Sequence, residues 1–183
     1  MNKSGHSYYR FGSRNVAIIY RHSIWRAPDI IDNKVVNSSI TFEPLDIDCI
    51  LFHSDFDLKQ IKRDILTYPN LVWGIMGRVS GQIVGFCVIY LKGSKTTQYR
   101  VEMCDAYIDC VCVSEEFRGH GIAQIILGNA IKIIRENGGN EILLAVRRNN
   151  ESMIHAIKKA GFRYVKQSFS VRFLGIRIIY PLL

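Results

Sequence analysis

The stretch from Ala106 to Arg135 constrains the fold more than any other part of this 183-residue chain. It begins with a strand-like run, Ala106 to Val113, and ends in a helical pattern in which apolar residues recur at three- and four-residue spacing. Only a short charged segment and a loop with two glycines lie between them. The stretch therefore predicts a strand that turns into a helix, with the loop at the helix N-terminus.

This loop has the properties of a phosphate site. The first N–H groups of a helix lack intrahelical partners, and the helix dipole adds partial positive charge there. The glycines allow close approach of a ligand, and an arginine supplies a permanent cation. We interpret the loop as a cradle for a pyrophosphate; its residues are Arg118, Gly119, His120, Gly121, Ile122 and Ala123. The chain has no GxxxxGK[ST], and its glycines do not complete GxGxxG.

The pattern Arg118-x-x-Gly121-x-Ala123 resembles motif A, [QR]-x-x-G-x-[GA], of the GNAT superfamily of acetyl-CoA-dependent N-acetyltransferases. A second resemblance is Ile83-Val84-Gly85-Phe86, which follows the turn-forming pair Ser80-Gly81. The segment 150–162 is also similar to motif B of the family, in which an asparagine precedes a helix that ends in Gly-Phe.

The resemblance implies how the coenzyme is held. In proteins of this family the fourth and fifth strands splay apart, and the pantetheine binds the exposed backbone of the fourth strand. Carried over, this assigns the backbone of Val111 and Val113 to the pantetheine. It also implies that Asn150 helps to hold the coenzyme, for which a plain helix cap is the alternative.

The order of the expected elements is also similar to the GNAT core. Strands are expected at 40–42, 71–79, 82–90, 106–113, 141–146, 162–166 and 170–180, and helices at 46–68, after the cradle and at 150–160. The predicted fold class is α/β, or α+β, with a mostly antiparallel twisted sheet of six to seven strands and about four helices. We expect residues 1–38 to be an N-terminal extension, with a strand at 16–20, packed on a GNAT-like domain at 39–183.

The catalytic groups common in the family are missing. The tyrosine of the motif B helix corresponds to Ile157, and a glutamate on the fifth strand to about Ala145. Asp109 has the same strand parity as Val111, so we expect it to project near the thioester and act as a base through water. The alternative for Asp109 is a structural carboxylate. For His155 we favour a surface position.

Composition limits the partners. The net charge of +8 and the pI of about 9.4 would attract the phosphates of coenzyme A, and a domain that binds nucleic-acid phosphates is an alternative that we do not favour. The five cysteines contain no CxxC, so we expect neither a metal nor a disulfide. No apolar run has the 18 or so residues that span a bilayer, and no secretory signal is recognisable, so we expect no membrane partner and a cytoplasmic protein.

The sequence thus predicts an acetyl-CoA-dependent N-acetyltransferase that modifies a primary amine of a small molecule or protein by direct attack on the thioester. A catalytically weak or inactive coenzyme A-binding module is the alternative, because the usual acid is absent. No motif in the sequence identifies the acceptor. A homodimer is a further candidate assembly, because the apolar segment 173–183 would suit burial against a partner.

Overall fold

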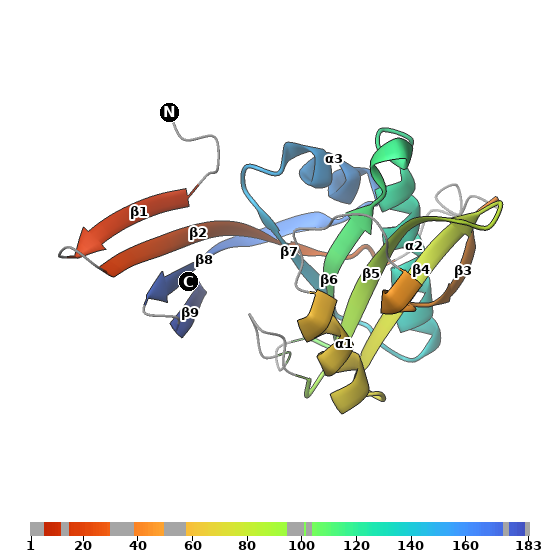
Figure 1. The fold of residues 1–183 in the computed structure, drawn as a ribbon, viewed down its shortest axis with the longest axis horizontal. Helices are drawn as coiled ribbons and strands as arrows, with labels where there is room; N and C mark the ends of the chain where they lie inside the picture. Colours follow the sequence, from red (N-terminus) through yellow and green to blue (C-terminus); the bar gives the residue numbers. More distant parts are fainter. Residues whose placement is uncertain are drawn as a thin grey trace.

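The computed structural model describes residues 6–11, 15–29, 39–49, 58–94, 101, 104–173 and 176–181. Within these ranges nine strands form one sheet, flanked by three α-helices and two short 3-10 helices (Figure 1). The strands are β1 (His6–Phe11), β2 (Asn15–Arg26), β3 (Thr41–Pro44), β4 (Val72–Val79), β5 (Gln82–Leu91), β6 (Ala106–Val113), β7 (Ile142–Arg147), β8 (Arg163–Phe173) and β9 (Ile176–Pro181). The helices are η2 (Ile47–Cys49), α1 (Leu58–Thr67), η3 (Glu115–Phe117), α2 (Ile122–Glu136) and α3 (Glu151–Lys159).

The predicted fold class is confirmed: the architecture is mixed α/β, and among the described pairings only that of β6 with β7 is parallel. The sheet is larger than the six to seven strands expected, because β1 and β2 join it. The strand order is β3-β4-β5-β6-β7-β2-β8-β9, with β1 paired to β2.

The N-terminal strand β2 lies inside this sheet. One of its edges pairs with β8, and the other pairs first with β1 and then, from His22 to Arg26, with β7. The short run predicted at 16–20 is therefore part of a 12-residue strand, and β1 was missed. The predicted boundary between residues 38 and 39 adjoins residues that lie outside the described ranges, and the division into extension and domain stays a prediction.

The closing strands differ from the prediction in their boundaries. The predicted gap at 167–169 lies within β8, because β8 pairs with β2 along most of its length, from Arg163 to Arg172. Beyond the helices, the outer parts of β1, β2, β8 and β9 extend away from the rest of the molecule (Figure 1).

The β4–β5 hairpin has the tight turn that the sequence predicts. Its two central residues, Ser80 and Gly81, have φ of 49° and 82°. Positive φ at both positions is typical of a type I′ turn, whose twist matches that of the paired strands. The hairpin places β5 against β6, so β5 supports the strand that leads into the cradle.

The two faces of the sheet are covered by different helices. On one face α2 packs on β4, β5 and β6, and α3 packs against α2. Four large side chains of α2 are at most 1% exposed: Ile126, Leu127, Ile131 and Ile134. Burial of each contributes about 1.5–3 kcal/mol to folding. On the other face α1 contributes Ile61 to a second apolar cluster, with Tyr90 of β5 and Tyr107 of β6.

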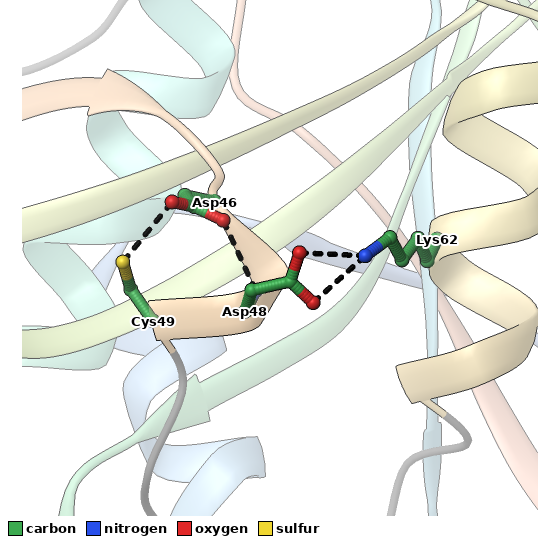
Figure 2. Close-up of polar contacts among 4 residues, drawn as sticks. All are labelled: Asp46, Asp48, Cys49 and Lys62. Atoms are coloured by element: carbon green, nitrogen blue, oxygen red, sulfur yellow. Dashed lines mark hydrogen bonds and ion pairs between the residues drawn. The ribbon is translucent and has the colours of Figure 1, made fainter.

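Helix α1 is tied to the 3-10 helix that precedes it. The Lys62 amine lies 2.6 Å from a carboxylate oxygen of Asp48, and the Cys49 thiol donates to Asp46 at 3.0 Å (Figure 2). The predicted helical region 46–68 is helical at both ends, since η2 lies near its start and α1 near its end. The sequence also indicates a break in this region near Ser54-Asp55, which lies outside the described residues.

Candidate active site: a cleft beside β6

A gap opens between β6 and β7. The two strands pair only from Ala106 to Ile108 of β6, opposite Ile142 to Leu144 of β7. Beyond this point β7 pairs with β2 instead. The β6 edge that β7 leaves extends from Asp109 to Val113, about 13 Å at roughly 3.3 Å per residue. Along this stretch β6 does not pair with β7, which leaves room for an extended ligand beside the strand.

A β-bulge interrupts β6 inside the gap. Phe86 of β5 lies opposite Cys112, but Val88, two residues on, lies opposite Asp109, so β6 has one extra residue. Cys110 has φ of 53°, in the left-handed region that non-glycine residues rarely adopt. The backbone N–H of Cys110 donates to the Asp109 carboxylate at 2.8 Å.

The bulge contradicts the parity argument for Asp109. Strand alternation fails across an extra residue, so Asp109 and Val111 do not share a face. Val111 packs against the core under α2, whereas Cys110 packs into the cluster under α1. The electrostatic neighbours of Asp109 are Cys110 and Tyr90, on the α1 face. Asp109 still lies at the closed end of the gap, where β6 and β7 separate.

A cavity of about 1120 Å³ lies along this edge, between β6, the start of α2 and one side of α3. Eight of the predicted binding residues line it: Val111, Val113, Arg118, Gly119, Gly121, Ile122, Ala123 and Asn150. The structure thus brings together residues that are up to 39 positions apart in the sequence. Two predicted site residues, His120 and Asp109, are not among the lining residues.

The N-terminus of α2 suits an anion. Gly121 is the N-cap residue, with φ of 78°, and no side chain caps the helix. A Cβ placed on Gly119 or Gly121 would meet nothing within 4 Å, so space is open beside both residues. The first N–H groups of α2 therefore face an open cavity, and the 15-residue helix adds its dipole. These features fit a pyrophosphate.

Arg118 is held in place at the cavity. Its Nε donates to the backbone oxygen of Val113 at 3.3 Å, and its Nη1 lies 3.1 Å from the Glu115 carboxylate. The side chain remains 56% exposed, so it is accessible to a ligand. The contact with Val113 fixes the guanidinium at the end of β6, next to the cradle.

Asn150 has the role of a helix cap. Its side-chain oxygen accepts hydrogen bonds from Met153 N and the Ser152 hydroxyl, both at 3.1 Å. It lines the cavity at the same time, so the two interpretations of this residue do not exclude each other.

Sequence reasoning missed most of the α3 side of the cavity. Ser152, His155, Ala156 and Lys159 line it, at the three- and four-residue spacing of one helical face. The spacing is present in the sequence. These residues lie on the face of α3 opposite the fully buried Ile157, so the helical periodicity could have identified them. His155 is exposed, as predicted, and also lines the cavity.

Comparison with known proteins agrees with this geometry. The profile of the Acetyltransferase (GNAT) family matches residues 42–162. The chain belongs to the GNAT family of acetyltransferases.

Solved structures of GNAT proteins share the fold at low sequence identity. A GCN5-related N-acetyltransferase-like protein from Streptococcus suis 89/1591 has a TM-score of 0.58 at 15% identity over 86% of this chain and 62% of that one. A GNAT-family acetyltransferase from Colwellia psychrerythraea gives 0.60 at 17%, over 84% and 55%. One from Elizabethkingia anophelis, solved with acetyl-CoA bound, gives 0.50 at 16%, over 71% and 80%. The chain thus spans less than two thirds of the length of the first two proteins.

This GNAT domain has apolar residues at two positions where the resemblance to the family implies catalytic side chains. Ile157, at the position of the motif B tyrosine, is 0% exposed and belongs to the core. Ala145 packs in the cluster under α1. Burial raises the pKa of the Cys87 and Cys110 thiols, and raises the pKa of Cys104 to about 12. These three cysteines are therefore poor nucleophiles. Among the described helices, none is long and apolar enough to cross a bilayer.

Proposed function

We propose that this protein is an N-acetyltransferase that uses acetyl-CoA to acetylate a primary amine by direct attack on the thioester. The observation that carries the proposal is the open β6 edge from Asp109 to Val113, which leads into the cavity at the uncapped N-terminus of α2. An extended chain with a pyrophosphate at one end matches this arrangement. The cytoplasm, as the place of action, and a homodimer remain predictions.

The protein would supply position and electrostatics. Backbone groups of Val111 and Val113 hold the pantetheine, and Gly119 to Ala123 with Arg118 hold the pyrophosphate. The thioester then lies near the closed end of the gap, beside Cys110 and Asp109. Acetyl-CoA supplies the activated acyl group: the amine nitrogen bonds to the thioester carbon and the C–S bond breaks.

Asp109 would act on the acceptor. An ammonium has no lone pair, so one proton must leave before attack, and the Asp109 carboxylate can take it through a water molecule. The departing thiolate can take the second proton, which the attacking nitrogen loses. This route needs no tyrosine at position 157.

The test is release of coenzyme A thiol during incubation of acetyl-CoA with a panel of primary amines: ethanolamine, putrescine, glucosamine and a peptide N-terminus. Asp109→Asn should lower the rate about 100-fold or more, as loss of a general base does. It should leave acetyl-CoA binding unchanged. Wild-type rates for Asp109→Asn would contradict its role as the base.

The second candidate is a coenzyme A-binding module without activity. The buried Ile157 in place of the tyrosine favours it. Binding of acetyl-CoA without thiol release on any amine would support this candidate and exclude the first. A failure to bind acetyl-CoA would contradict both.

A further inference from the structure

The outer parts of β1, β2, β8 and β9 form a four-stranded antiparallel arm, made of residues 6–11, 15–22, 168–173 and 176–181. The arm extends beyond the helices, whereas the rest of the sheet lies between α1 on one face and α2 with α3 on the other (Figure 1). Among the described helices, none lies over the arm. Because a sheet with one apolar face must bury that face, the composition of the two faces of the arm is informative.

The strand register assigns apolar residues to one face of the arm. Residues that are directly opposite in neighbouring strands share a face, and every second residue along a strand lies on that face too. In β8 and β9, Val171 pairs with Ile178. The pairs on either side of it at the same parity are also apolar or aromatic. The residues of these two strands that share the face are Phe169, Val171, Phe173, Ile176, Ile178 and Tyr180.

The same face continues across β2 and β1. Ile19 of β2 pairs with Val171, so both residues lie on it. Ala17 follows at the same parity and pairs with Tyr9 of β1, and Phe11 lies two residues beyond Tyr9. Arg21 is the only charged residue that the register assigns to this side of the arm, which we call the apolar face.

The apolar face continues the side of the sheet that α2 and α3 cover. Ser23, two residues after Arg21, pairs with Val146, which packs in the cluster under α2. Trp25 follows at the same parity and packs in that cluster, whereas its partner in β8, Tyr164, is 51% exposed. Cover by the described helices therefore ends at this point, and the arm carries the apolar face beyond it.

The opposite face of the arm is basic. Arg172 and Arg177 pair with each other on it, and Arg10 pairs with Val16 there. A nucleic acid or an acidic protein would select that face, because its charges complement theirs. The apolar face offers such partners little, since it has one charged residue. Two copies of this chain, each with a net charge of +8, would repel each other least through the apolar face.

We propose that a second copy of this chain covers the apolar face, so that the arms of two copies stack face to face in a homodimer. Packed sheets lie about 10 Å apart, and a two-fold axis makes identical faces self-complementary. The face has five aromatic and five aliphatic residues. Covering half of each would bury roughly 800 Å² per copy, one side of a standard interface. An exposed apolar face of this size is rare in a monomer.

The test is sedimentation equilibrium of the full chain at micromolar concentration, where the wild type should be a dimer. Ile178→Lys places a charge on the apolar face and should make the chain monomeric. Ile179→Lys is the matched control, because Ile179 is the next residue of the same strand and pairs with Ser170 on the opposite face. It makes the same change in charge and should remain a dimer. Circular dichroism and Tm check that both variants fold.

Ile178→Thr provides a second measurement that does not depend on a charge, since threonine is also β-branched and suits a strand. It should raise the dissociation constant of the dimer about 100-fold, because a two-fold interface loses the apolar contact twice. A monomeric wild type, equal dissociation by both lysine variants, or an unchanged dissociation constant for Ile178→Thr would overturn the inference. None of these measurements involves acetyl-CoA, so the proposed function is tested separately.

Discussion

Among the described glycines, Gly85 of β5 is the one at which an added methyl group should lower the stability of the fold most. An ideal Cβ there would lie 2.4 Å from the backbone oxygen of Cys112 and 2.7 Å from Ile126 Cδ1. Real Cβ atoms do not approach so closely, and the oxygen belongs to the β5–β6 ladder, so the strands must separate to accommodate it. Gly85→Ala should thus destabilise the protein by about 2 kcal/mol, a typical cost of overpacking. That corresponds to a fall in Tm of about 4 to 8 °C.

The matched control is Gly77→Ala. Gly77 of β4 pairs directly with Gly85, but its ideal Cβ would meet only side chains, the nearest being Ile40 Cγ2 at 3.1 Å. Side chains can shift by a few tenths of an ångström, so we expect a cost of less than about 1 kcal/mol. Differential scanning fluorimetry of both variants, with and without acetyl-CoA, is the assay. Equal Tm values for the two variants would refute the claim that β5 and β6 are in tight contact where Gly85 meets the backbone of Cys112.

Three further outcomes follow from the structure. Deletion of residues 1–26 should abolish cooperative unfolding by circular dichroism, because β2 is paired on both edges, whereas deletion of 1–14 should leave a folded protein; a stable, cooperative 27–183 fragment would contradict this. Asp105 accepts hydrogen bonds from the backbone N–H groups of Glu141 and Asn140, which lower its pKa. Its contribution is therefore present above the unfolded pKa of about 3.9 and lost as the pH falls through the lower folded value. Asp105→Asn should lower Tm at pH 7, and this loss should shrink as the pH falls below the unfolded pKa and through the folded one; a loss that does not change with pH would argue against this linkage. Iodoacetamide at pH 7.5 should leave Cys87, Cys104 and Cys110 unmodified in the native protein, since their raised pKa values keep them as thiols; mass spectrometry would reveal any early labelling.

Local patterns in the sequence predicted the part of the fold that holds the coenzyme cleft. The run from Ala106 to Val113 coincides with β6, and Ser80-Gly81 with the β4–β5 turn. In both cases the information is local: alternation or apolar content defines the strand, and glycine or a polar residue defines the turn.

The features that the sequence did not predict depend on long-range pairing. The insertion of β2 beside β7 joins segments more than 100 residues apart, and no local pattern identifies its partner. The bulge at Cys110 likewise leaves no signal in an apolar run, yet it changed the face on which Asp109 lies. The position of Asp64 next to Tyr90 depends on how α1 packs on the sheet, which periodicity alone does not determine.

Binding of acetyl-CoA at the N-terminus of α2 is the central claim, and thermal stability with and without this ligand tests it most directly. Ala123→Glu is the informative variant: Ala123 lines the cavity in the first turn of α2, where a glutamate suits the helix dipole but would repel phosphates. Lys132→Gln, near the other end of α2, makes the same change in net charge and serves as the control.

At about 100 times its dissociation constant, acetyl-CoA should stabilise the wild type and Lys132→Gln by about 2.7 kcal/mol, or about 5 to 11 °C in Tm. Ala123→Glu should fold normally and show little shift at the same concentration. A shift of the same size in Ala123→Glu, or none in the wild type at millimolar acetyl-CoA, would contradict the assignment of this cleft.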